Sequence, residues 1–230
     1  FRRVLFRSFV FYIVIFGSSS MLLNSVTEEK QNRIIEVLMT SIRPIQMLAG
    51  KVVALGMAGL FQMAVWALIG SSLYGLLGRT FSFMAVLGTL PPNLVGWGLL
   101  YFLFGFAVYA SLMAGLGALV SNLREASQAT MFIMMPLLAP LMLISVLVSR
   151  PNSPLAIALS LFPFTAPVTM PMRLAIGGVP LWQTILSVLL LAGTSVLIVR
   201  SAAGIFRSQN LLSGQTFKLG PFFKAFIGKV

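Results

Sequence analysis

Residues 94–120 read LVGWGLLYFLFGFAVYASLMAGLGALV, a stretch without a single charged side chain. About 20 mainly apolar residues are enough for a helix to cross the hydrocarbon core of a bilayer. Four other stretches have the same apolar character, at 5–26, 52–78, 130–149 and 181–200. The pattern therefore predicts an all-α fold, a polytopic transmembrane bundle with about five spans.

The composition of the whole chain agrees with lipid as its solvent. Hydrophobic residues make up 58% of the 230 residues and charged residues only 9%, whereas about 25% of a soluble domain is charged. The chain has no His, no Cys and only four carboxylates. It therefore lacks an imidazole base, a thiolate nucleophile and the usual metal ligands, which excludes most enzymes and predicts no catalytic or metal site. No carboxylate lies within a predicted span, which argues against a proton- or sodium-coupled carrier.

Basic residues indicate how the chain is oriented in the membrane. Ten of the 16 fall in 27–51, in 121–129 or from position 200 onward, and six lie in the remaining connections and at the start. Because Lys and Arg favour the cytoplasmic side, the C-terminus is predicted to be cytoplasmic. The membrane itself is expected to be the inner or plasma membrane of a prokaryote. The basic, aromatic tail at 206–230 is then expected to lie on anionic lipid rather than on nucleic acid.

The start of the chain is open to two interpretations. The first eight residues, FRRVLFRS, are interpreted as a non-native or truncated start, and the alternative is a signal peptide. The transmembrane domain is placed at 9–205. An odd number of spans that begins outside leads us to expect a further helix upstream.

The most polar connection, TEEKQNRIIEVLMTSIRPIQMLAGK at 27–51, is the most informative one. Ser25 and Glu28 have the spacing of a capping box, which predicts that a helix starts here, and Pro44 is expected to end it. Apolar residues recur on one face of this predicted helix, at Ile34, Ile35, Leu38, Met39 and Ile42. Such a helix either anchors in the interface or docks a soluble partner, and its balance of acidic and basic side chains favours docking.

Two blocks of sequence resemble one transporter family. EEKQNRIIEVLMTSIRPIQMLAGK at 28–51, continuing to GLFQ at 59–62, closely resembles the cytoplasmic segment of type-2 ABC exporter permeases of the NatB-like class. SLFPFTAPVTMPMRLAIGGVPLWQ at 160–183 resembles the external segment before the last span of that family. The resemblance covers about residues 10–205, with Gln31 where the family often has Glu. It implies a fragment that lacks the family's first transmembrane helix and extracellular domain.

The resemblance implies a permease subunit that couples ATP hydrolysis by a separate ABC ATPase subunit to outward transport. ATP and magnesium would be bound by that partner, with no cofactor in this chain, and a second permease chain would complete a homo- or heterodimer. Gly50 and Lys51 lack the other glycine of a phosphate-binding loop, in agreement with this division. Carried over by position, the ATPase-coupling residues are Glu28, Glu29, Lys30, Arg33, Glu36, Val37 and Leu38, with a second contact at Arg124 and Glu125. The alternative is an ATPase-independent secondary carrier or a membrane scaffold, with 27–51 as its interfacial anchor.

Two further features concern helix packing and the last connection. Small residues recur along one face of the 94–120 span, at Ala110, Ser111, Ala114, Gly115 and Ala118. They predict a close helix contact, within this chain or at a dimer seam. In 150–180, Pro163, Pro167 and Pro171 are expected to prevent a regular helix. We interpret this stretch as a broken or re-entrant element near the outer face, an external gate or a rigid cap, with Arg173 at its rim.

Overall fold

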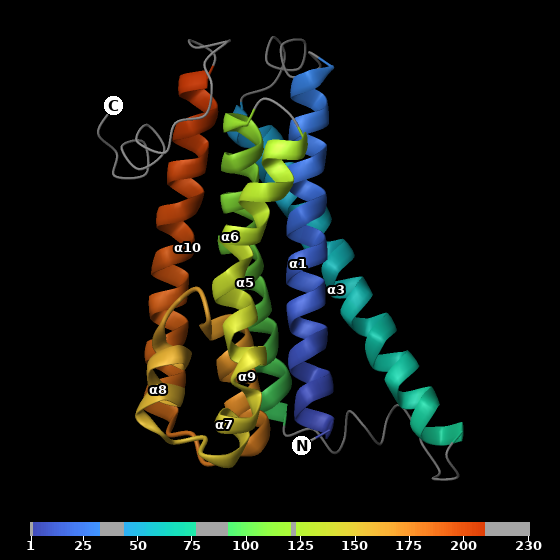
Figure 1. The fold of residues 1–230 in the computed structure, drawn as a ribbon, viewed down its shortest axis with the longest axis vertical. Helices are drawn as coiled ribbons and strands as arrows, with labels where there is room; N and C mark the ends of the chain where they lie inside the picture. The colour runs from blue at the N-terminus through green and yellow to red at the C-terminus, as the bar shows by residue number, and fades with distance from the viewer. Residues whose placement is uncertain (1, 33–43, 77–91, 121–122, 210–230) are drawn as a thin grey trace.

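The computed structural model describes residues 2–32, 44–76, 92–120 and 123–209, and every regular element in these ranges is an α-helix (Figure 1). The long helices are α1 (Arg2–Gln31), α3 (Pro44–Leu76), α5 (Pro92–Leu119), α6 (Leu123–Met142) and α10 (Leu181–Gln209). The short ones are α7 (Ile144–Ser149), α8 (Pro154–Leu161) and α9 (Ala166–Ile176). The all-α prediction is confirmed.

Four of these helices contain segments long and apolar enough to cross a membrane: Ser8–Gln31, Ala49–Trp66, Gly96–Leu119 and Leu181–Ile205. They correspond to four of the predicted spans. The stretch predicted as the remaining span, 130–149, is divided between α6 and α7. The helix α6 begins in the polar sequence around Arg124 and Glu125, contains Pro136 and Pro140, and ends at Met142. Proline supplies no N–H for the helix ladder, so Pro136 and Pro140 weaken α6 in the turns that precede them. The Leu143 N–H still donates to the Ala139 carbonyl at 3.1 Å, directly after the end of α6.

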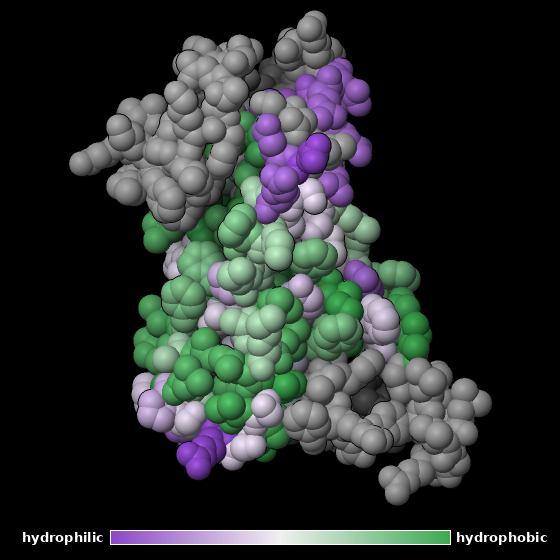
Figure 2. Space-filling view, in the orientation of Figure 1, coloured by the Kyte–Doolittle hydropathy of each residue, from purple (hydrophilic) through white to green (hydrophobic). Residues whose placement is uncertain are grey.

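The helix α5 forms the centre of the bundle and packs against α1 and α10. In an 18-residue window of the segment Gly96–Leu119, 67% of the residues are buried, against only 6% in Ala49–Trp66 on α3. Figure 1 shows α3 leaning away from the other helices toward one end. The outer surface of the bundle is mainly hydrophobic around its middle (Figure 2), as expected for a surface that faces lipid.

Close packing around α5 depends on residues with little or no side chain. A Cβ atom on Gly117 would lie 3.2 Å from the carbonyl oxygen of Leu23 on α1, and one on Gly105 would lie 2.6 Å from Pro167 Cβ on α9. All of the small residues singled out in the sequence are buried, namely Ala110, Ser111, Ala114, Gly115 and Ala118. They are covered by helices of the same chain.

The two ends of the bundle differ in character. At one end, called here the charged end, α1, α5 and α10 finish and α3 and α6 begin, and Figure 2 shows hydrophilic side chains gathered there. The other end, called here the short-helix end, is made by α7, α8 and α9 with the beginnings of α5 and α10. The bundle thus separates its polar features into two sites, one at each end.

Candidate functional site

The charged end contains those predicted coupling residues that the structure describes. Glu28, Glu29 and Lys30 lie in the last turn of α1, and Arg124 and Glu125 lie in the first turn of α6, which packs against α1. Glu28, Arg124 and Glu125 are exposed. Two segments far apart in the sequence therefore present charges of both signs at one end of the bundle. The other predicted members lie outside the described residues: Arg33, Glu36, Val37 and Leu38.

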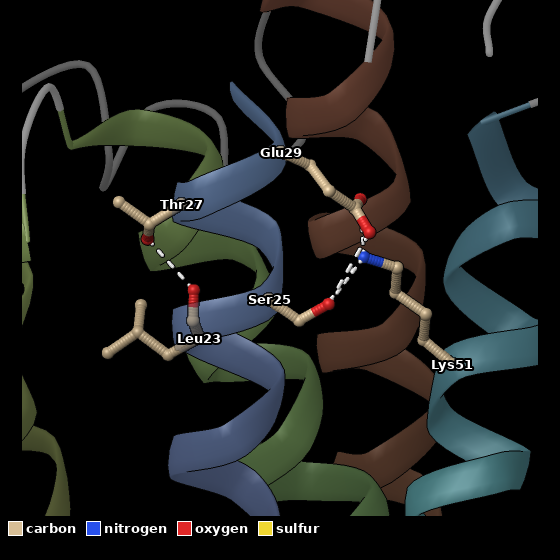
Figure 3. A network of polar contacts seen from close by, with 5 residues as sticks. All are labelled: Leu23, Ser25, Thr27, Glu29 and Lys51. Carbon is tan, nitrogen blue, oxygen red and sulfur yellow. Dashed lines mark hydrogen bonds and ion pairs between the residues drawn. The ribbon is translucent and has the colours of Figure 1, made fainter. Parts of the chain in front are cut away.

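Glu29 is turned toward α3 rather than toward solvent (Figure 3). Its Oε2 lies 2.5 Å from Lys51 Nζ, and the two side chains are only 22% and 18% exposed. Lys51 also donates a 2.8 Å hydrogen bond to Ser25 Oγ, which donates in turn to Glu29 Oε1 over 3.5 Å. This triad joins the end of α1 to the beginning of α3.

The predicted helix start at Ser25 is therefore wrong. The helix α1 continues through Ser25 to Gln31, and Thr27 inside it donates a 2.8 Å hydrogen bond back to the Leu23 carbonyl. The Ser25 hydroxyl is used between helices, where it accepts from Lys51, instead of capping a helix of its own. Hydroxyl groups inside helices commonly bond the carbonyl four residues earlier, so the Ser-Val-Thr-Glu spacing occurs in both settings.

Lys30 is also directed inward, toward the end of α5. Its Nζ donates hydrogen bonds of 2.5 Å to the Ala118 carbonyl and 3.0 Å to the Val120 carbonyl. Carbonyl groups at a helix C-terminus have no intrahelical partner and carry a partial negative charge, so an ammonium group is well suited to them. Of the three neighbours Glu28, Glu29 and Lys30, only Glu28 is an exposed side chain.

A hollow of about 310 Å³ runs along the exposed side of α1 at this end. It is lined by Met21 and by five polar residues, Asn24, Ser25, Glu28, Glu29 and Asn32. The carboxylate of Glu28 and the neighbouring amides offer hydrogen-bond acceptors that suit a basic or amide side chain. Among the described residues there is no cluster of three His, Cys, Asp or Glu side chains that could hold a metal ion.

The short-helix end contains a buried arginine. Arg173 of α9 has no solvent exposure, so the expectation that it lies at a rim is wrong. Its Nε donates to the Pro151 carbonyl at 2.7 Å and its Nη1 to Ser160 Oγ at 2.6 Å. Its Nη2 donates to Asn152 Oδ1 at 3.2 Å and to Gln183 Oε1 at 2.9 Å.

All four acceptors of Arg173 are neutral, so its charge is buried without a carboxylate against it. Burial lowers the pKa of Arg173, but a guanidinium remains protonated in proteins. The acceptors come from the α7–α8 connection, α8 and α10, and Ser187 of α10 also donates to the Ser160 carbonyl. The arginine thus holds the short helices to the start of the last span.

The prolines of 150–180 affect the backbone less than expected. Only Pro163 lies in a break, the turn between α8 and α9, whereas Pro167 is in the first turn of α9 and Pro171 is inside it. The expectation that all three prevent a regular helix is therefore wrong. A proline is tolerated in a first helical turn because the N–H there has no partner in any case. The Thr165 hydroxyl donates hydrogen bonds to the Leu159 and Phe162 carbonyls. The Tyr109 hydroxyl of α5 donates a 2.6 Å hydrogen bond to the Phe164 carbonyl. These bonds stabilise the turn between α8 and α9.

Comparison with known proteins places the chain in a family. Residues 1–202 match the family described as ABC-2 family transporter protein. This chain belongs to the ABC-2 transporter family. Family membership and the four apolar helices make it a multi-pass membrane protein of the permease type.

Two relatives illustrate how far the similarity extends. An uncharacterised protein of Methanocaldococcus jannaschii is 30% identical over 92% of this chain and 48% of its own length. The uncharacterised protein YhaP of Bacillus subtilis is 27% identical over 90% of this chain and 51% of its own length. The chain thus spans about half the length of these relatives. No solved structure matches it.

Proposed function

We propose that this chain is the membrane-spanning part of an ATP-driven exporter, and that a separate ATPase subunit docks on its charged end. The observation that carries the proposal is the pairing of two exposed charged patches in an ABC-2 family protein. Glu28 belongs to the end of α1, and Arg124 and Glu125 belong to the beginning of α6. Helix ends held next to each other by the bundle form a surface that a soluble subunit can push or pull.

The mixture of charges favours a protein partner over a lipid surface. An amphipathic helix that binds anionic lipid is mainly basic on its polar face. Here Glu28 and Glu125 lie at the same end of the bundle as Arg124, and all the carboxylates in the described part of the chain are at this end. Complementary charges of both signs fix the register of a protein interface.

The rest of the proposal concerns the separate roles of the ATPase subunit and the permease chains. ATP and magnesium would be held by the ATPase subunit, and the charged end would face the cytoplasm together with the C-terminus. A second permease chain, identical or homologous, would complete the route across the membrane. Transport would be outward, by alternating access of the two permease chains.

The test is co-purification of the full protein that contains this chain with the ATPase subunit encoded beside it. The native protein is compared with Glu28→Lys combined with Arg124→Glu, which reverses exposed charges on both patches. Glu36→Lys tests the part of the coupling segment outside the described residues. The matched control is Arg150→Glu, a charge reversal at an exposed position of the short-helix end.

Retention of the ATPase subunit by the native protein and by Arg150→Glu, with loss in the charged-end variants, supports the proposal. Good membrane expression without retained ATPase in any form would exclude the exporter. The secondary carrier or membrane scaffold would then be the better description of the chain.

A further inference from the structure

We propose that Lys30 is a positioning residue of the transporter, which fastens the end of α1 to the end of α5 so that the two charged patches move as one body. The inference rests on the proposed docking of an ATPase subunit at the charged end. It assigns to Lys30 a role inside the membrane protein in place of the direct ATPase contact that the sequence predicts for it.

The hydrogen bonds of Lys30 join residues that are far apart in the sequence. Lys30 Nζ reaches the carbonyl groups of Ala118 and Val120, residues 88 and 90 positions further along the chain. Ala118 is in the last turn of α5, and Val120 directly follows the last residue of that helix, Leu119. Hydrogen bonds with an ionised donor are shorter and stronger than neutral ones, and the end of a helix adds its own partial negative charge.

The approach of α1 to α5 leads directly to this contact. Leu23 and Val26 of α1 lie so close to Gly117 that a Cβ atom there would be 3.2 Å from both. Val26 and Ala118 are buried in the same core. The two helices are already in tight contact one turn before Lys30. The ammonium group therefore extends an existing α1–α5 contact, and it does not have to span a gap between the helices.

The end of α5 is close in sequence to the second charged patch, Arg124 and Glu125 at the beginning of α6. Val120 is followed shortly by Leu123, where α6 begins, and α6 presents Arg124 and Glu125 in its first turn. Lys30 itself is two positions after Glu28, the exposed carboxylate of the first patch. A single side chain therefore connects the end of α1, which bears the first patch, to the end of α5, the helix that precedes α6 in the chain.

Three successive residues at the end of α1 have different surroundings because they point in different directions from the helix. Each step turns by about 100°, so three neighbours point in three directions. Glu28 is exposed, Glu29 pairs with Lys51 of α3, and Lys30 bonds the end of α5. Force applied to the first patch would thus reach α3 through Glu29 and the end of α5 through Lys30.

The experiment measures whether the patches form one body. The chain has no native cysteine, so Gln31→Cys and Ser127→Cys, both at exposed positions, can carry a pair of spin labels in the full protein in nanodiscs. Pulsed electron resonance then gives the distribution of distances between the patches. It is recorded for native Lys30, for Lys30→Arg, which keeps a cationic donor, and for Lys30→Met, which keeps only the stem.

Without the ATPase subunit, native protein and Lys30→Arg should give one narrow distribution, and Lys30→Met one at least twice as wide. With the ATPase subunit bound, adding ATP should leave the native distance unchanged but shift it in Lys30→Met. Retention of the subunit should be unaltered, because Glu28, Arg124 and Glu125 remain. If Lys30→Met does not yield folded protein, Lys30→Gln replaces it with the same expectation.

Equal widths for native protein and Lys30→Met would overturn the inference, as would an ATP-dependent change in the native distance larger than its width. Failure of the native protein to retain the ATPase subunit would overturn the proposed function, and with it the movement of the two patches under ATP. The recording without the ATPase subunit distinguishes these failures, because it depends on Lys30 alone.

Discussion

Arg173 of α9 and Gln183 of α10 are joined by a hydrogen bond of 2.9 Å from Nη2 to Oε1, and both side chains are buried. With three more acceptors from Pro151, Asn152 and Ser160, the guanidinium holds α8, α9 and α10 together. Its planar fork of donors is what allows one side chain to serve four acceptors. The short-helix end is thus held together by a cation that has no anion beside it.

Replacing Arg173 with lysine is expected to destabilise the protein although the charge is kept. An ammonium group has three donors on a flexible stem and cannot reproduce the fork, so at least one buried acceptor loses its partner. Each buried group left unsatisfied costs about 1–3 kcal/mol. The melting temperature of Arg173→Lys in detergent should therefore fall. Arg150→Lys, at an exposed position of the same end, should leave it unchanged, and equal melting of both variants would show that the network contributes little.

A carboxylate next to Arg173 should instead stabilise the short-helix end. Gln183→Glu keeps the acceptor and adds the missing negative charge beside the guanidinium. The added stability requires the ionised carboxyl, so it is expected at neutral pH and should be lost when acid protonates the side chain. The measurement is the melting temperature relative to native protein between neutral and acid pH. A lower melting temperature at neutral pH would contradict it, and Gln183→Met controls for loss of the amide.

How much of this the sequence could predict depends on the range of each interaction. Hydropathy is a property of a continuous segment, so four spans could be predicted from their composition alone. The break after Met142 was missed because two prolines within a run of apolar residues do not by themselves show where a helix ends. The same limit explains why Pro171 was expected to interrupt the chain and instead lies within α9.

The contacts of the two polar sites depend on tertiary structure. Lys30 binds carbonyl groups about 90 positions away, and backbone acceptors have no signature in a sequence. Arg173 did leave a signal, since no carboxylate follows Glu125 in the chain and the surrounding residues are mostly apolar. An arginine in such a neighbourhood needs neutral acceptors, and Asn152 and Gln183 were the largest ones at hand.

Packing around α5 gives a prediction with a matched pair of glycines. A Cβ atom on Gly105 would lie 2.6 Å from both Cβ and Cγ of Pro167, whose ring cannot move aside, so Gly105→Ala should force α9 away from α5. On Gly115 the nearest atom would be Ile205 Cδ1 at 3.5 Å, an ordinary contact. Gly105→Ala is expected to cost about 1–3 kcal/mol, as overpacked cores do, and Gly115→Ala little. Melting temperatures of the two variants in detergent check this, and a tolerated Gly105→Ala would show that α9 can shift.

The ion pair between Glu29 and Lys51 should contribute a measurable coupling energy at the charged end. The 2.5 Å contact lies between side chains that are about a fifth exposed, so salt screens it less than a surface pair. We expect the stabilities of Glu29→Gln, Lys51→Met and the double variant to give a coupling of about 1 kcal/mol. The control cycle combines Lys51→Met with Glu28→Gln, because Glu28 is exposed, and its effects should simply add. Additive effects in the Glu29 cycle as well would mean that α3 is held to α1 by its apolar contacts alone, and that force on the end of α1 does not reach α3 through this pair.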